Sequence, residues 1–145
     1  MKIYNLTVQT DQEAFDAVVQ HLAAQKEAAM SQFAGRRVCV YQTADFKRCA
    51  VGGILDAGPG DITLQELQAN VDDLIHSVYG VRGVKFETGD VSTGLLLELQ
   101  HIHDNQFNWG NKHTGLEAIG IEDLRRVARS RGLNQAVVDE VFCEN

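Results

Sequence analysis

The sequence has little of several features that mark particular protein classes. It has one proline in 145 residues, which excludes a proline-rich linker or tail. Three cysteines are too few, and odd in number, for a secreted scaffold built on disulfides. The longest unbroken apolar run covers only residues 38–41, whereas a membrane span needs about 20 residues. The N-terminus has no apolar core of the signal-peptide kind. We therefore expect a cytoplasmic protein with no membrane partner.

Positive charge is also scarce. Thirteen lysines and arginines stand against 20 aspartates and glutamates, for a formal net charge of −7. Nonspecific binding to phosphates requires clustered positive charge. The main basic group falls on one predicted helix and is typical of a solvated helix face; it consists of Arg125, Arg126, Arg129 and Arg131. We expect no nucleic-acid partner, and an acidic surface that serves solubility or, in the alternative interpretation, mimics nucleic acid to block a nucleic-acid-binding protein.

The remaining composition is that of an ordinary globular protein. Hydrophobic residues make up 44% of the chain, so neither a metal nor a disulfide is needed to explain folding. A domain of this length buries roughly 68–70% of the surface that its unfolded chain exposes. We predict a single domain over residues 1–145, with no bound cofactor.

Apolar spacing of three and four residues predicts five helices. They are expected at residues 11–33, 64–78, 95–106, 121–131 and 135–142. Thr10 with Glu13, and Thr63 with Glu66, have the spacing of a capping box at the start of the first two helices. Gly35 is placed to end the first helix.

Between the first two helices the period changes to two. Valines alternate with Cys39 and Tyr41, and a second run of this kind covers residues 47–51, which predicts a β-hairpin. A turn centred on Ala44 places Cys39 opposite Cys49, and a turn centred on Asp45 places Tyr41 opposite Cys49. Both registers put the two sulfurs on one face, whereas an even-length loop separates them.

Weaker signals predict short strands within residues 2–8 and 84–86, and a loop over residues 107–111. Helix, hairpin and further helices do not form the alternation that a doubly wound parallel sheet requires. The predicted fold class is therefore α+β, with a small antiparallel hairpin or sheet packed against about four to five helices.

Two segments resemble a pattern found in small uncharacterised proteins of bacteria and their phages. The first is the run from Cys39-Val-Tyr41 to Arg48-Cys49-Ala-Val-Gly52, and the second is Leu99-Gln-His-Ile-His103-Asp104. The stretch of residues 19–25 is similar to the first helix of those proteins. The chain departs from the pattern because it has no glycine in the hairpin turn and no proline-containing acidic stretch after it. The resemblance implies a phage or prophage accessory protein and no catalytic mechanism.

A cysteine nucleophile is one hypothesis for a site. A histidine near a thiol lowers its pKa and activates it, so Cys39 or Cys49 would act with His103 as base. Neighbouring helix residues point about 100° apart, so Asp104 is not expected to orient His103. The opposing interpretation is that both cysteines are small hydrophobic residues of the core.

The residues Cys39, Cys49, His103 and His21 also have the chemistry of zinc ligands. The spacing of the two cysteines matches no common zinc motif, and His101 and His103 fall on different faces of a predicted helix. We therefore expect no metal site. A buried polar network of His21, Gln25, Gln100 and His103 is a further interpretation of these positions.

The binding residues that we predict are Trp109, Tyr41, His21 and Asp104. Trp109 with Phe107 and Tyr79 forms an exposed patch in one interpretation and, in the favoured one, Trp109 closes the core beneath its loop. The sequence favours a non-enzymatic interaction protein, an accessory or inhibitor protein that binds a host macromolecule through an acidic surface. The alternative is a hydrolase or transferase that uses Cys49 or Cys39 with His103.

Overall fold

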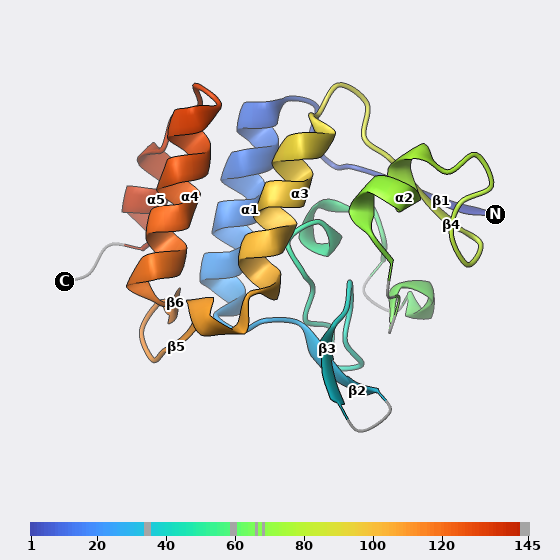
Figure 1. The fold of residues 1–145 in the computed structure, drawn as a ribbon, viewed down its shortest axis with the longest axis horizontal. Helices are drawn as coiled ribbons and strands as arrows, with labels where there is room; N and C mark the ends of the chain where they lie inside the picture. The colour runs from blue at the N-terminus through green and yellow to red at the C-terminus, as the bar shows by residue number, and fades with distance from the viewer. Residues whose placement is uncertain (34–35, 59–60, 66, 68, 143–145) are drawn as a thin grey trace.

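Four helices stand side by side in one half of the molecule, and short strands, turns and one short helix form the other half (Figure 1). The computed structural model describes residues 1–33, 36–58, 61–65, 67 and 69–142, and the side chains of 31–33, 36–39 and 62 are outside the description. The helical layer consists of α1 (Asp11–Gln25), α3 (Thr93–Asp104), α4 (Ala118–Ser130) and α5 (Ala136–Val141). Helix α2 (Val71–His76) lies in the other half.

Each helix of the layer buries the apolar stripe that predicted it. In α1 the buried residues include Phe15, Val18 and Leu22, at helical spacing. The hydroxyl of Thr10 accepts the backbone N–H of Glu13 at 3.1 Å, which confirms this side of the predicted cap. The predicted helices at 95–106, 121–131 and 135–142 are confirmed as α3, α4 and α5.

Helix α1 ends earlier than predicted. It stops at Gln25 rather than near residue 33, and Lys26 follows in the left-handed conformation with φ of 61°. The N–H of Ala29 donates to His103 at 2.9 Å, and Met30–Phe33 forms strand β2. These long-range contacts outweigh the local helical preference of the segment. Gly35 lies outside the described residues.

The described residues form three two-stranded sheets. Strand β1 (Lys2–Asn5) pairs in parallel with β4 (Val84–Glu87), so both predicted strands are confirmed. Strand β2 pairs antiparallel with β3 (Arg36–Cys39). The third sheet joins β5 (Trp109–Asn111) and β6 (Gly115–Leu116), where a loop was predicted. The α+β class is confirmed.

The predicted hairpin of residues 37–51 forms only near its turn. Its first arm is β3, which pairs with β2, so that the backbone of Cys39 lies opposite Met30 rather than Cys49. Beyond β3 an antiparallel bridge joins Gln42 to Arg48, and the N–H of Cys49 donates to the carbonyl of Tyr41 at 3.3 Å. The turn centred on Asp45 is therefore confirmed, and the turn centred on Ala44 is wrong.

The second predicted helix is much shorter than expected. Residues 62–64 form a single 3₁₀ turn, and α2 begins only at Val71, with Asn70 as its cap. The Asn70 side-chain oxygen accepts the N–H of Asp72 at 2.8 Å. Glu66, the partner expected for Thr63, lies outside the described residues.

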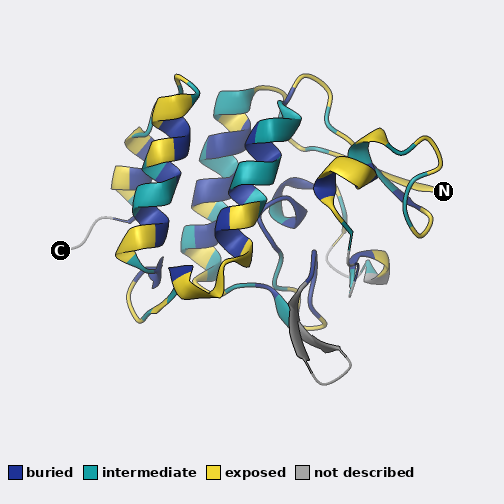
Figure 2. Cartoon of the chain, viewed as in Figure 1, coloured by how far each residue is buried: buried dark blue, intermediate teal, exposed yellow. Residues whose placement is uncertain are grey.

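One hydrophobic core runs through both halves of the molecule. Residues 49–51, which have no regular structure, are as buried as the apolar stripes of α1 and α3 beside them (Figure 2). This arrangement places Cys49 and its neighbours between the helical layer and the strands. Among the described residues no helix is both long enough and apolar enough to cross a membrane.

Candidate functional site

Side chains of α1 hold the backbone on one side of Cys49. The Gln25 amide both donates to the carbonyl of Arg48 at 2.8 Å and accepts its N–H at 2.7 Å. His21 donates from Nε2 to the same carbonyl at 2.9 Å. Burial lowers the pKa of His21, and the bond to the Arg48 carbonyl offsets part of that shift. His21 is therefore a neutral imidazole that fixes buried irregular backbone.

Cys49 itself closes a tight turn. Its side chain is fully buried, and its sulfur accepts the N–H of Gly52 at 3.2 Å. Burial raises the pKa of the Cys49 thiol far above its ordinary value. Because the thiolate is the nucleophilic form, this environment makes Cys49 an inert thiol.

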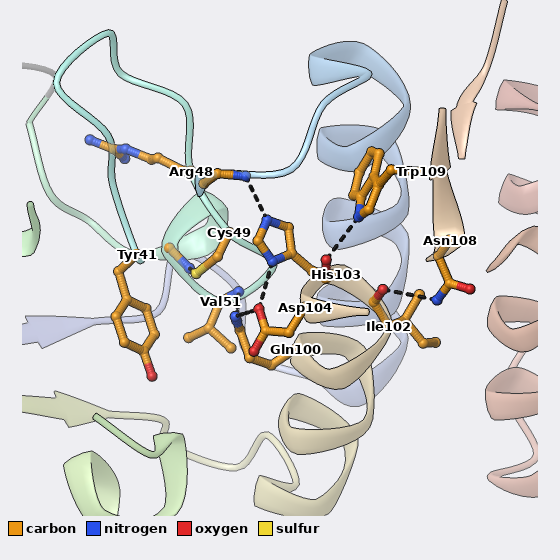
Figure 3. Close-up of polar contacts among 12 residues, drawn as sticks. Tyr41, Arg48, Cys49, Val51, Gln100, Ile102, His103, Asp104, Asn108 and Trp109 are labelled. Atoms are coloured by element: carbon orange, nitrogen blue, oxygen red, sulfur yellow. Dashed lines mark hydrogen bonds and ion pairs between the residues drawn. The ribbon is translucent and has the colours of Figure 1, made fainter. Parts of the chain in front are cut away.

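Helix α3 holds the other side of the same segment. The Gln100 side chain accepts the N–H of Val51 at 3.1 Å and donates to Asp104 at 2.9 Å. His103 is fully buried, and its Nδ1 lies 2.8 Å from the Asp104 carboxylate (Figure 3). The four residues expected to form one buried polar network instead form two pairs: His21 and Gln25 bond to the backbone of Arg48, and Gln100 and His103 both bond to Asp104.

The expectation that Asp104 does not orient His103 is wrong. An angle of about 100° separates the Cα–Cβ directions of adjacent helix residues, but rotation about the side-chain bonds brings Oδ1 to Nδ1. The second ring nitrogen, Nε2, accepts the N–H of Ala29 at 2.9 Å. An acceptor role for Nε2 places the proton on Nδ1, so His103 is a neutral imidazole that donates to Asp104.

This geometry bears on the cysteine–histidine hypothesis. A base must direct a free nitrogen at the proton of its nucleophile, and both nitrogens of His103 already bond to Ala29 and Asp104. The side chain of Cys39 lies outside the described residues. A catalytic role for Cys39, Cys49 and His103 stays a prediction. In this arrangement no ring nitrogen of His103 is free to accept a proton from a thiol.

A metal centre finds no ligand set in the described part of the chain, where no three His, Cys, Asp or Glu side chains are grouped to hold an ion. Nε2 of His21 donates to the Arg48 carbonyl, and Nε2 of His103 accepts the N–H of Ala29. The four residues proposed as zinc ligands therefore include two that already have other partners.

Trp109 covers the outer side of His103. Its indole N–H donates to the His103 carbonyl at 2.8 Å, and the two rings meet edge to face with centroids 5.8 Å apart (Figure 3). Part of the indole stays accessible to solvent. Trp109 thus closes the core beneath its loop, as the favoured interpretation predicted, and also contributes to the surface.

Tyr41 is inside the core. Its hydroxyl donates to the Ala69 carbonyl at 2.7 Å, its ring meets Phe86 edge to face, and burial raises its pKa strongly. Asp104 differs, because 40% of its side chain is exposed. It lines a small cavity of about 190 Å³ beside Tyr41 and a larger one beside Trp109.

The larger cavity has a volume of about 740 Å³. It lies where the chain leaves α1, beside the end of α3 and the β5–β6 hairpin. Its charged and aromatic lining consists of Lys26, Lys47, Lys112, Glu27, His103, Asp104 and Trp109. Sequence reasoning identified His103, Asp104 and Trp109 and missed the lysines, which are isolated in the sequence and belong to no motif.

A second polar network, which no sequence signal indicated, holds Ala57, Gly58, Asp61 and Thr63. The Arg48 guanidinium donates to the carbonyls of Ala57 and Gly58, both at 3.0 Å. The Tyr4 hydroxyl donates to Asp61 at 2.6 Å. Burial opposes ionisation of Asp61, but hydrogen bonds from Thr63 and Tyr4 outweigh burial and hold its pKa well below its usual range.

The alternative interpretation, an exposed patch of three aromatic residues, is not supported. Tyr79 is 89% exposed and Phe107 is 77% exposed. The α2–β4 connection that carries Tyr79 and the segment before β5 that carries Phe107 lie well apart in the molecule (Figure 1). Each is therefore a separate surface feature.

Comparison of the chain with models of protein families, with curated proteins and with solved structures finds no match.

Proposed function

We propose that the chain is a non-enzymatic interaction protein that binds a basic host protein through an acidic and apolar surface. The phage-type resemblance is consistent with such an accessory or inhibitor role. The surface, named here the α2–β4 surface, comprises Val78, Tyr79, Met1, Asp72 and Asp73. One observation carries the proposal: Val78 and Tyr79 are 77% and 89% exposed on adjacent positions.

Exposed apolar residues grouped on a surface indicate a contact site. Val78 and Tyr79 follow α2 directly, and the sulfur of Met1 lies against Gly80, the next residue. Ile3, on the neighbouring strand, is also exposed. Four of the seven exposed large hydrophobic residues in the described chain therefore belong to β1, its start, or the α2–β4 connection. Tyrosine is among the residues that most often contribute large binding energies.

The connection that presents Tyr79 is held by internal hydrogen bonds. The ammonium group of Lys85 donates to the carbonyls of Ile75 and Ser77, at 2.6 and 3.2 Å. The Ser77 hydroxyl donates to the carbonyl of Gly80 at 3.0 Å. A loop fixed before binding loses less conformational entropy on association, which supports a role in recognition.

Charge indicates the chemistry of the partner. Asp72 and Asp73 are exposed in the first turn of α2, and they outnumber the one exposed arginine of the α2–β4 connection, Arg82. The basic residues of α4, in contrast, are neutralised within the chain: Arg125, Arg126 and Arg129 each pair with a carboxylate of α4 or α5. A basic partner is therefore favoured over an acidic one, because opposite charge speeds and orients association.

The test compares two variants on immobilised protein exposed to a bacterial lysate. Replacing both Val78 and Tyr79 by serine removes the apolar contact, whereas Phe107→Ser alters a residue of matching exposure away from this surface. We expect a captured protein to be retained by the wild type and by Phe107→Ser, and to be reduced at least about tenfold by the double variant. Thermal unfolding confirms that all three proteins are folded.

Two results would contradict the proposal. One is that nothing is captured above background by the wild type. The other is that every captured protein is retained equally by the double variant, which would place the contact elsewhere on the chain.

A further inference from the structure

We infer that the cavity beside Trp109, here called the Trp109 cavity, is a binding site for a small anionic ligand that carries a planar aromatic ring, of the size and class of a nucleoside monophosphate. The site is separate from the α2–β4 surface and does not depend on it. Its volume of about 740 Å³ falls within the roughly 300–1,000 Å³ typical of small-molecule sites.

The charge of the lining is opposite to that of the whole chain. Three lysines and two carboxylates line the cavity, although the protein carries a formal charge of −7. Lys47 pairs with Glu27, so one cation and one carboxylate neutralise each other. Asp104 accepts hydrogen bonds from His103 and Gln100. The two lysines that remain are the cations available to a ligand.

Those lysines, Lys26 and Lys112, have no carboxylate within ion-pair distance in the described residues. The chain has more carboxylates than cations, yet these two lysines line one cavity without an ion-pair partner. An anionic ligand would supply the missing negative charge. An ammonium group binds a phosphate through charge-assisted hydrogen bonds.

Lys26 also occupies an unusual backbone position. Its φ of 61° lies in the left-handed region, where a helix end favours glycine. A side chain at such a position has a conformational cost, and residues of this kind are concentrated at functional sites. The chain places a lysine there, at the edge of the cavity.

Trp109 offers an aromatic surface for the planar half of the ligand. Its indole is fixed by the bond to the His103 carbonyl, yet part of it faces the cavity. Stacking of a nucleobase on an aromatic side chain contributes roughly 1–3 kcal/mol. The amide of Gln106, also on the lining, has no hydrogen-bond partner among the described residues and can serve a base edge.

The two sides of the cavity are held in a fixed relation by a close backbone approach. Gly115 of β6 has φ of +78°, and a Cβ added there would lie 2.6 Å from the carbonyl oxygen of Lys26. The β5–β6 hairpin, with Trp109 and Lys112 on it, therefore packs directly on the backbone at the end of α1. The site is preorganised, which reduces the entropy lost on binding.

Trp109 is the only tryptophan, so its fluorescence reports on this cavity alone. We would titrate the protein with adenosine monophosphate, and with adenosine and inorganic phosphate as the two halves, following fluorescence and, independently, heat of binding. The expected result is saturable binding of the monophosphate, with each half binding at least about tenfold more weakly. Equal binding of either half alone, or no saturable binding of the monophosphate, would overturn the inference.

The matched variants are Lys26→Gln with Lys112→Gln, and Arg82→Gln as control. Arg82 is an exposed cation without an ion-pair partner in the described chain, located on the α2–β4 connection. The double variant should weaken monophosphate binding at least about tenfold, and Arg82→Gln should leave it unchanged. Equal weakening in both proteins would show a general charge effect and overturn the site.

Binding of a single-stranded oligonucleotide with the same base and a 5′-phosphate tests whether the natural ligand is a free nucleotide or the end of a nucleic acid. Binding no tighter than that of the monophosphate supports the small ligand. Binding tighter by more than about tenfold, which contacts to further phosphates would provide, overturns it in favour of a nucleic-acid partner.

Discussion

The helical layer and the irregular segment of residues 40–58 satisfy their backbone hydrogen bonds in different ways. In α1 and α3 the backbone groups bond within the helix, so the side chains need only supply an apolar stripe. Residues 40–58 contain no α-helix and no long strand, yet about half of them are buried. Many of their N–H and C=O groups bond to backbone in short turns and bridges. Side chains of the helices complete the set at two residues: Gln25 and His21 bond to the backbone of Arg48, and Gln100 bonds to that of Val51.

This difference explains why chemically reactive residue types gather here without an evident catalytic site. A buried unpaired backbone group costs free energy comparable to a lost hydrogen bond. Histidine, glutamine and cysteine side chains around residues 48–53 supply those missing partners. The four predictions that follow test whether this segment is as rigid as the helices and depends on these side chains.

The largest expected effect is the protection of Cys49 from alkylation. In a protein with Cys39 and Cys143 replaced by serine, we expect iodoacetamide to modify Cys49 at least about a thousandfold more slowly in the native state than in urea, because the thiol is buried and protonated. Ser130→Cys in the same background places a thiol on the exposed end of α4 and should react at nearly the unfolded rate. Accelerated modification of Cys49 would instead favour the cysteine enzyme.

The second prediction concerns the close contact between Gly53 and α1. A Cβ on Gly53 would lie 2.6 Å from Cγ of the His21 ring, so Gly53→Ala should reduce the free energy of unfolding by about 3 kcal/mol. Gly58→Ala is the matched control, since nothing lies within 4 Å of its Cβ position, and should change stability by less than about 0.5 kcal/mol. Urea denaturation measures both. Equal effects of the two substitutions on stability would show that residues 48–53 shift to accommodate the added methyl group, and that this segment is not rigid.

The third prediction compares two residues of α3. Gln100→Ala leaves the N–H of Val51 without its acceptor and should cost about 2 kcal/mol in the free energy of unfolding. Glu98→Ala removes an ion pair with Arg131 that is partly open to solvent and should cost about 0.5 kcal/mol or less. Chemical denaturation of the two variants gives the difference. A larger loss for Glu98→Ala would contradict the distinction between the two regions.

The smallest expected effect is a pH dependence that arises at His21. Its pKa in the folded state is lowered, chiefly by burial, so the unfolded chain takes up a proton first as the pH falls. The stabilising contribution is present above the ordinary histidine pKa of about 6.5 and declines below it. Denaturation curves between about pH 7 and about pH 5 should show a smaller decline for His21→Gln than for the wild type.

The control for this measurement is His76→Gln, which removes an exposed histidine paired with Asp72. It should keep the decline of the wild type. If His21→Gln also keeps that decline, the pH dependence does not originate in the contact between α1 and Arg48.

The parts of the fold that were predicted correctly are those specified by neighbours in the sequence. The helix start at Thr10 follows from a side-chain cap, and the Asp45-centred turn follows from alternation on both sides of it. The polar positions His21, Gln25, Gln100 and His103 were identified from the helix pattern, but the partners of each were not, because most of these partners are backbone groups.

Some of the parts predicted incorrectly depend on distant residues. The run after Gln25 has helical composition, yet α1 ends there because His103 and Gly115 bind or pack against residues 26–29. The short α2, the β5–β6 hairpin and the bond between His103 and Asp104 were missed for a different reason, because they are local features without a clear signal in the residue pattern. For the site, Trp109 and Asp104 were identified from the sequence, and Lys26 and Lys112 were not.

By itself the sequence determined the α+β class, the four helices of the layer, the acidic balance and the absence of a long apolar run, because composition and local periodicity specify these properties. The tertiary structure decided the rest. It brought strands β1 and β4 together, joined the N–H of Ala29 to Nε2 of His103, and placed Lys26 beside the hairpin that carries Trp109. These features are contacts between residues far apart in the chain, and local periodicity does not specify a contact of that kind.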